Sequence, residues 1–387
     1  MNILIIETEK YGHNLHLYLR SLINKFSKKH NIFLLTSNEM FTDKNFKILN
    51  KKYKFRIFKK QFPKKPSTVN FYSGTLYQIS YYFFLKRAFK SLSKKFHFNH
   101  VYVNNVNHFD KSISIFGSPF ENKYFSVFYT NLNIFLGNEK YSNKRYSSFL
   151  YYFLFCKFFK IKELKNIFIS NPILNSFLKK KRFLNKIKYI EEFSRLEKNN
   201  IKFDIIKKKS KNKKKILVYG RIREDKDIEN LLKLYNYDYI KNNVIVIIAG
   251  QQEKNISNFI KKKSLKIKNI ISINKYIEPK LENYLFKISD FIWIGYKKDF
   301  FGSSAVFFQA SIANKPIICS NHGLVAWFNR LYKIGLSTNL NNSLKIINFL
   351  INSSNIKKTK FKKINHIHNE KNFVNKIYNI IVKNEHD

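Results

Sequence analysis

The pattern of apolar and polar residues at the start of the chain alternates between strand-like and helix-like segments. Residues 2–7 ("NILIIE") and residues 31–37 ("NIFLLTS") are apolar runs of strand length. Between them lies a loop that contains Gly12, and a segment follows in which apolar residues recur at helical spacing: Leu15, Leu19, Leu22, Ile23 and Phe26. This order of strand, helix and strand predicts a parallel α/β sheet.

Further short apolar runs extend the predicted sheet. They lie at residues 55–60, 100–105, 124–129 and 165–170, with one more candidate strand at 186–192. Residues 75–96 read as a helix between two of these strands. We therefore expect a first α/β domain over residues 1–206.

A lysine-rich run separates the two halves of the chain. Residues 207–215 ("KKKSKNKKK") contain seven lysines and no apolar residue. A charged run without core residues is typical of a solvated linker, which explains this segment more readily than a specific polyanion site does. The prediction is a linker at 207–215 and a second domain at 216–387.

The alternation of strands and helices restarts after the linker. The predicted strands lie at 215–220, 243–250, 270–274, 290–295 and 315–320, and the predicted helices at 227–240, 255–265, 279–289, 303–314 and 324–335. We expect the last of these helices to end at Gly335 in the left-handed conformation. The fold class predicted is α/β, with two consecutive doubly wound Rossmann-like domains that face a cleft, and ligands bind such sheets at the carboxyl ends of their strands.

Candidate chemistry gathers at those strand ends in the second half. The segment "GRIREDK" (220–226) follows the first strand, and glycines and serines recur after later ones. Cations, glycines that admit close backbone approach, and serines that open a helix together indicate a diphosphate cradle, although a solvated basic turn is the plainer alternative. The candidate catalytic residues of this half are Arg221 and Lys226, and the candidate donor-binding residues are Gly220, Gly250, Tyr276, Gly302, Ser303, Ser304 and Gln309.

The net charge points to an anionic partner. The chain has 73 Lys and Arg against 25 Asp and Glu, a formal charge of +48. Such a balance favours nucleic acid, an anionic membrane surface or phosphorylated substrates, although codon bias of an AT-rich genome contributes to the lysine excess. No zinc-finger spacing, RNP-like motif or G-x-x-G loop is present, so a nucleic-acid partner is the weaker alternative.

Several features predict a cytoplasmic protein. The two cysteines, Cys156 and Cys319, are far apart, and the first residues lack the pattern of a secretory signal. No apolar run reaches the ~18 residues of a spanning helix. The segments 75–96 and 147–165 mix large aromatics with lysines. They are read first as buried helix faces, and peripheral association with the inner membrane face is the functional hypothesis.

The stretch from about Lys214 to Leu350 resembles the nucleotide-sugar-binding domain of glycosyltransferases with the GT-B fold, of the glycosyltransferase-1/4 kind. The matching segments are "GRIREDKDIENLL" (220–232), "VIIAGQQ" (246–252), "KYIEPKLENYLFKISDFIW" (275–293) and "GSSAVFFQASIANKPII" (302–318). The resemblance implies that Arg221 and Lys226 hold the diphosphate of a nucleotide-sugar donor. It further implies a hexosyl transfer to a glycan or lipid-linked acceptor, with retained configuration and without a metal or other cofactor.

The sequence departs from the family pattern at two positions. Most of the family carries two glutamates eight positions apart, where this chain has Phe301 and Gln309. Gln309 can still hydrogen-bond a diol as a neutral group, whereas Phe301 cannot replace its glutamate, for which Asp299 is the nearby substitute. A catalytically silent protein and a nucleic-acid-binding protein on the same scaffold therefore remain alternatives.

An acceptor-side group is expected from the first half of the chain. The candidates are Gly12 and His13 in the first loop, and His108 or Asp110 in "NNVNHFD" (104–110). A lone loop histidine is more often merely exposed than catalytic. His108 is nevertheless the predicted catalytic residue of this half, because it follows the strand at 100–105.

Overall fold

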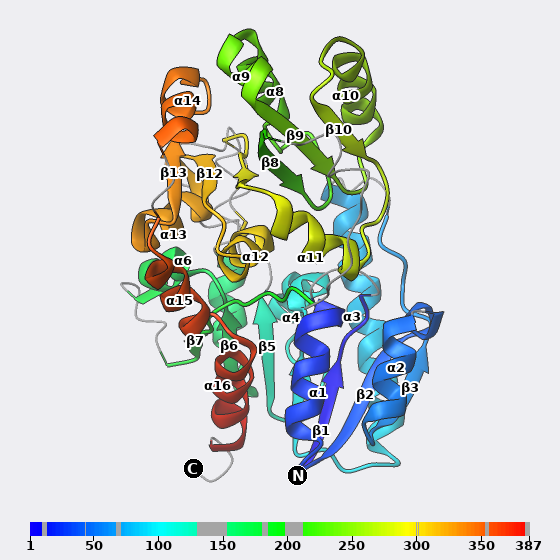
Figure 1. Ribbon diagram of the computed structural model, residues 1–387. Helices are drawn as coiled ribbons and strands as arrows, with labels where there is room; N and C mark the ends of the chain where they lie inside the picture. The colour runs from blue at the N-terminus through cyan, green and yellow to red at the C-terminus, as the bar shows by residue number, and fades with distance from the viewer. Residues whose placement is uncertain are drawn as a thin grey trace. The chain divides into compact units, whose positions relative to one another are not determined.

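The computed structural model describes residues 1–9, 14–42, 44–66, 71–129, 153–179, 185–197, 212–298, 300, 302–352 and 356–383. The chain forms two compact units, Met1–Glu192 with Glu370–Asp387, and Phe193–Asn369. Each is an α/β unit, as predicted (Figure 1). The division differs from the predicted one in two respects. The second unit begins before residue 207, and the last helix belongs to the first unit.

The first unit is built on a seven-stranded parallel sheet. Its strand order is β3-β2-β1-β4-β5-β6-β7, so the order reverses between β1 and β4. The strands are β1 (Asn2–Ile6), β2 (Asn31–Ser37), β3 (Arg56–Lys60), β4 (His100–Val103), β5 (Phe125–Tyr129), β6 (Leu164–Ile169) and β7 (Ile187–Tyr189). The helical segments are η1 (Asn14–Leu19), α1 (Arg20–Phe26), η2 (Asn38–Thr42), α2 (Lys44–Lys52), α3 (Phe71–Ser93), η3 (Val106–His108), α4 (Asp110–Phe116), α6 (Pro172–Lys179) and α16 (Glu370–Lys383).

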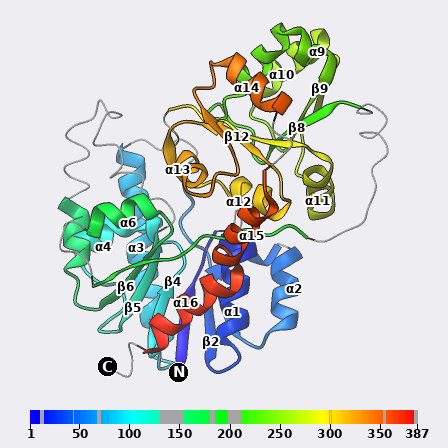
Figure 2. The same ribbon diagram turned by 60° about the vertical axis from the view of Figure 1, so that its left-hand side comes forward.

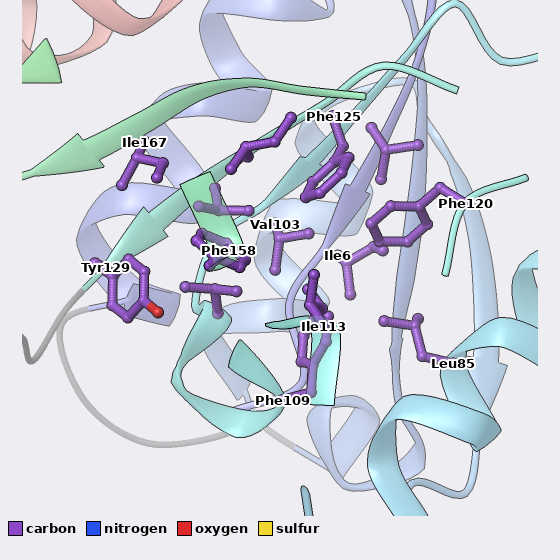
Figure 3. Close-up of a cluster of buried hydrophobic side chains, with 14 of the residues drawn as sticks. Ile6, Leu85, Val103, Phe109, Ile113, Phe120, Phe125, Tyr129, Phe158 and Ile167 are labelled. Carbon is purple, nitrogen blue, oxygen red and sulfur yellow. The ribbon is translucent and has the colours of Figure 1, made fainter. Parts of the chain in front are cut away.

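Apolar residues cover both faces of this sheet, which explains why its strands read as continuous apolar runs. On one face, alternate strand residues pack against α3, α4 and the helical residues 153–159. Figure 3 shows part of this core, with Ile6, Val103, Phe125, Tyr129 and Ile167 from the sheet and Leu85, Phe109, Ile113 and Phe158 from the covering segments.

The other face is covered by α1 and α16. The Tyr18 ring lies 4.6 Å from Phe373 of α16 and 5.5 Å from Phe128 of β5, measured between ring centroids. Lys376 of α16 also forms an ion pair with Glu191, with 3.0 Å between nitrogen and oxygen. Figures 1 and 2 both show α16 beside α1, so the C-terminal helix completes the first unit.

The second unit is built on a six-stranded parallel sheet. Its strand order is β10-β9-β8-β11-β12-β13, which reverses between β8 and β11. The strands are β8 (Lys214–Tyr219), β9 (Val244–Ala249), β10 (Ile270–Ile273), β11 (Phe291–Ile294), β12 (Ile317–Ser320) and β13 (Gly335–Thr338). The helical segments are α8 (Ile228–Lys233), η5 (Leu234–Asn236), α9 (Asp238–Asn243), α10 (Lys254–Lys266), α11 (Pro279–Ile288), α12 (Ala305–Ile312), α13 (Gly323–Tyr332), α14 (Ser343–Asn352) and α15 (Lys358–Ile367).

One prediction about this unit is wrong. Gly335 does not end a helix, because α13 ends earlier and Lys333 takes the left-handed conformation, with φ 54°. Gly335 instead opens β13, where a Cβ atom would lie 2.1 Å from the Ile317 carbonyl oxygen. The glycine is therefore required for close strand packing rather than for a cap.

In the part of the chain that the structure describes, no helix combines the length and the apolar character needed to cross a bilayer.

Candidate active site

The carboxyl ends of β8 and β9 meet through two glycines. Gly220 and Gly250 follow these strands with φ of 93° and 138°, values that suit glycine. A Cβ atom on Gly250 would lie 1.9 Å from the Gly220 carbonyl oxygen, and the Gly220 N–H donates to the Ala249 carbonyl at 3.1 Å. The two strand ends thus form a backbone surface without side chains, beside the point where the strand order reverses.

Lys226 lies against this backbone surface. Its ammonium group is buried, donates to the Tyr219 carbonyl oxygen, and would lie 3.5 Å from a Cβ atom placed on Gly220. Burial, and to a smaller extent the nearby charge of Arg223, lower the pKa of Lys226 to about 7, while Asp225 opposes the shift. A buried lysine that holds its proton so weakly would be stabilised by an incoming anion.

The two arginines of the turn have different surroundings. Arg223 is held by Asp225 through two hydrogen bonds of 3.1 and 2.6 Å, and its guanidinium lies 5.9 Å from the centre of the Phe300 ring. The Arg221 side chain is 70% exposed and lies 3.5 Å from Glu253. Surface pairs of this length contribute little, so Arg221 can turn to a ligand at small cost.

The loop after β11 joins the same turn. Tyr296 pairs with Lys226 in an isolated antiparallel bridge, the Asp227 N–H donates to the Gly295 carbonyl at 3.1 Å, and the Lys297 N–H donates to the Asp225 carbonyl at 2.8 Å. The structure therefore brings the basic turn together with residues 295–297, which follow β11. Phe301 and Asp299 lie outside the described residues.

The start of α12 differs from the prediction. Ser304 occupies the N-cap position, but its hydroxyl makes no capping bond to the helix. The Ser304 hydroxyl lies 3.2 Å from the Tyr296 hydroxyl, and the Tyr296 ring stacks on Phe300 at 3.7 Å. The expected serine cap is therefore wrong for Ser304, because its hydroxyl bonds to the tyrosine. Gly302 and Ser303 precede it and are partly exposed.

Gln309 contacts a carboxylate that sequence reasoning missed. Its Nε2 donates to Glu282 Oε1 at 2.6 Å, from α12 to α11. Burial raises the pKa of Glu282, while hydrogen bonds from Tyr219 and Gln309 lower it. A carboxylate is thus present beside position 309 although the family's glutamate is not. Tyr276 is 70% exposed and precedes the same helix.

The carboxyl edge of the first sheet carries a second cluster of polar residues. Glu7 follows β1 and Asn104 follows β4, where that strand order reverses. Asn104 Nδ2 donates to Glu7 Oε2 at 2.5 Å, and the Glu9 N–H donates to Glu7 Oε1 at 2.8 Å. Burial raises the pKa of Glu7 to about 7. The signal in the sequence was "ETE" (7–9) directly after a buried strand.

His108 belongs to this cluster. Its Nε2 lies 3.1 Å from Glu9 Oε1, and its Nδ1 lies 2.8 Å from the Tyr77 hydroxyl. The ring is buried and stacks on Tyr81 at 5.3 Å. His108 is thus placed at a sheet edge with acid–base partners, whereas Gly12 and His13 lie outside the described residues.

Asp110 has a bond that accounts for its position. It accepts a hydrogen bond from the Tyr129 hydroxyl at 2.9 Å, and burial raises its pKa.

Across the described ranges, no three His, Cys, Asp or Glu side chains gather in a way that could hold a metal ion.

Comparisons with known proteins concern the sequence of the second half and the fold of the chain. Residues 176–363 match the family described as glycosyl transferases group 1. No curated protein matches the sequence significantly. The fold is similar over 99% of the chain to Anabaena HepE in complex with UDP, with a TM-score of 0.68, 13% identity and 100% of that chain covered.

Two further structures show the same fold. Sucrose-phosphate synthase from Thermosynechococcus elongatus has a TM-score of 0.72 and 12% identity, with 99% of this chain and 98% of that chain covered. A glycosyltransferase from Rickettsia africae has a TM-score of 0.65 and 16% identity, with 100% and 97% covered. Residues 176–363 thus match the family of group 1 glycosyl transferases, and the chain as a whole has the GT-B fold of these structures.

Proposed function

We propose that the protein transfers a hexosyl group from a nucleoside diphosphate sugar to a glycan or lipid-linked acceptor, as in the biosynthesis of a surface polysaccharide. The observation that carries the proposal is the buried Lys226, whose pKa is lowered to about 7, beside the bare backbone of Gly220 and Gly250. The fold neighbour HepE has been solved with UDP, with UDP and glucose, and with UDP-glucose, which supports a donor of this class.

The donor diphosphate would lie at the turn after β8. In the reaction, the bond between the sugar carbon and the β-phosphate oxygen breaks, and a bond from that carbon to an acceptor hydroxyl oxygen forms. Negative charge grows on the leaving diphosphate, so fixed positive charge beside it lowers the barrier. Lys226 and Arg221 would supply this charge without a metal ion, and we expect retention of the sugar's configuration.

The other donor contacts follow from the loops around the turn. Tyr276 and Ser303 are exposed or partly exposed near strand ends, and Gly302 admits a close backbone approach. Gln309, which donates to Glu282, would present its carbonyl oxygen to the hydroxyls of the nucleoside. The hydrogen bond to Glu282 orients the Gln309 amide. The negative charge that the family's glutamate would carry at position 309 is carried here by the neighbouring Glu282.

The acceptor would bind at the edge of the first sheet. His108 lies between Glu9 and Tyr77, an arrangement that can relay the proton released by an acceptor hydroxyl. Gly12 and His13 remain proposals for the same side. We further propose that this reaction takes place in the cytoplasm.

The first test is calorimetry of the purified protein against UDP, GDP, ADP and CMP. We expect one clear binder. Arg221→Ala should weaken its affinity about tenfold, because it removes a charge-assisted contact worth roughly 1.5 kcal/mol. Lys233→Ala is the matched control, since it removes one exposed positive charge from α8, where Lys233 contacts Asn230. Equal affinities of the native protein and Arg221→Ala would contradict the assignment.

The alternatives give different results in the same experiments. A catalytically silent protein would bind a nucleotide without sugar transfer to any acceptor. A nucleic-acid-binding protein would bind none of the four nucleotides but would bind RNA or DNA with a strong dependence on salt.

A further inference from the structure

An exposed apolar stripe runs along α3 in the first unit. Tyr72, Leu76 and Phe83 lie within about 40° of one another around the helix axis, since each residue turns the helix by about 100°. Their exposed fractions, together with those of Ile115 and Phe116 on α4, lie between 39% and 77%. Scattered apolar residues are ordinary on a surface, but an aligned set of large ones marks an interaction site.

The residues of α4 extend this stripe into a patch. The Phe83 and Phe116 rings lie 5.3 Å apart, and the Tyr82 hydroxyl donates to the Phe116 carbonyl at 3.2 Å. Figures 1 and 2 both show α3 and α4 side by side. Tyr72, Leu76, Phe83, Ile115 and Phe116 are called the α3–α4 patch below.

Beyond the patch, the residues at about the same angular position on α3 are basic. Arg87 and Lys90 are exposed, and Lys90 comes back to the angular position of Tyr72. No acidic residue occurs anywhere in α3. The helix therefore presents an apolar half and a basic half along one line of about 27 Å. This exposed line can contact a bilayer, with its aromatic and aliphatic side chains in the acyl boundary and its cations at the phosphates.

The charge of the patch's surroundings restricts what can cover it. A second copy of a chain with a formal charge of +48 would bring like charges together, which is unfavourable. A nucleic acid would satisfy Arg87 and Lys90 but would leave the aliphatic Leu76 and Ile115 without a matching surface. An anionic bilayer offers an acyl region to the apolar residues of α3 and phosphate groups to Arg87 and Lys90.

The patch adjoins the His108 cluster. Tyr77, which follows Leu76 directly, lies 2.8 Å from His108 Nδ1 through its hydroxyl. Gln78 accepts from the Lys111 N–H at 3.1 Å and so joins α3 to the start of α4. A molecule anchored in a bilayer at the patch would hold its head group within a helical turn or two of His108.

We propose that the α3–α4 patch docks on an anionic membrane surface and that the acceptor is anchored in that membrane. The membrane docking stands on the patch itself, whereas the anchored acceptor rests on the proposed glycosyltransferase function. Of the two acceptor classes considered above, this inference selects the lipid-linked one.

The test is co-sedimentation of the full-length protein with phosphatidylcholine vesicles, with and without 30 mol% phosphatidylglycerol. We expect binding to the anionic vesicles and little binding to the neutral ones. Leu76→Ser/Ile115→Ser should weaken vesicle binding at least tenfold. Leu265→Ser is the matched control, because Leu265 is 86% exposed on the lysine-rich α10 of the second unit and should have no effect.

The outcomes separate the parts of the proposal. Binding of the double variant equal to that of native protein would show that charge alone acts, and would overturn the docking site. Unaltered thermal unfolding and UDP affinity in the double variant exclude a folding defect. Tight binding to RNA with no vesicle binding overturns the proposal in favour of a nucleic acid. If no nucleotide binds but the vesicle results hold, the proposed function fails while the docking surface stands.

Discussion

Lys226 should make the binding of a nucleoside diphosphate depend on pH in a specific way. In the free protein the pKa of Lys226 is lowered to about 7 by burial, so at pH 8 only about a tenth of the molecules carry its charge. A bound diphosphate places negative charge beside the ammonium and returns the pKa towards its ordinary value of 10.5. Binding above pH 7 must therefore take up a proton.

The size of the effect follows from this linkage. One proton taken up per ligand weakens binding by a factor of up to ten, or about 1.4 kcal/mol, for each pH unit. Between pH 7 and pH 9, Kd should rise about fiftyfold, because about half of the lysines are still charged at pH 7. The free phosphate titrates near pH 6 and is already ionised in this window, so it contributes little.

Calorimetry at pH 8 in two buffers of different ionisation enthalpy measures the uptake directly. We expect about 0.9 proton per nucleotide for native protein. Lys226→Met should bind more weakly at pH 7 and take up no proton. Arg221→Ala is the matched control, because it removes a cation from the same turn that does not titrate, and it should weaken binding at every pH with an unchanged slope. A native protein whose affinity is flat from pH 7 to 9 would refute the role given to Lys226.

Two further predictions concern stability. Burial raises the pKa of Glu7 from 4.5 to about 7. Between these pH values the folded protein therefore binds more protons than the unfolded chain. The free energy of unfolding should fall by about 3 kcal/mol as pH rises from 4.5 to 7. Urea unfolding at pH 5 and 7.5 should show this loss in the native protein relative to Glu7→Gln, and an identical pH dependence of the two would contradict it. Gly250→Ala should lower Tm strongly because its Cβ would lie 1.9 Å from the Gly220 carbonyl oxygen. Gly117→Ala, which has a φ of 79° and a ψ of −164° but no atom within 4 Å, should cost about 1–3 kcal/mol from backbone strain alone, so similar Tm values for the two variants would argue against the backbone contact.

The parts of the fold that could be predicted are those that depend on local pattern. Continuous apolar runs such as Ile3–Ile6 and Val244–Ile248 are fully buried strands, because parallel sheets are covered on both faces. The order of strands, glycines and cations likewise placed Gly220 and Lys226 in one turn after the first strand of the second half. Both are neighbours along the chain, so the turn geometry follows from the local sequence.

Contacts between distant residues could not be predicted in this way. The helical spacing of apolar residues in α16 indicates that one face is buried, but not which residues cover it. In the structure, Phe373 on that face stacks on Tyr18. The bond between Gln309 and Glu282 joins two helices, and the cluster of Glu7 with Asn104 joins residues 97 apart in sequence. The prediction that Gly335 ends a helix was wrong for a related reason. A glycine that follows a helix can either end it in the left-handed conformation or allow close packing in the next strand.

The return of α16 to the first unit has a consequence for how the protein is made. The first 192 residues emerge from the ribosome without the helix that packs on Tyr18 and Phe128, whereas Phe193–Asn369 is a continuous segment. The second unit can therefore finish folding before the first, although it is synthesised later. Until residue 373 arrives, one face of the first sheet stays partly uncovered, so the early half of the nascent chain is the half that depends on protection from aggregation.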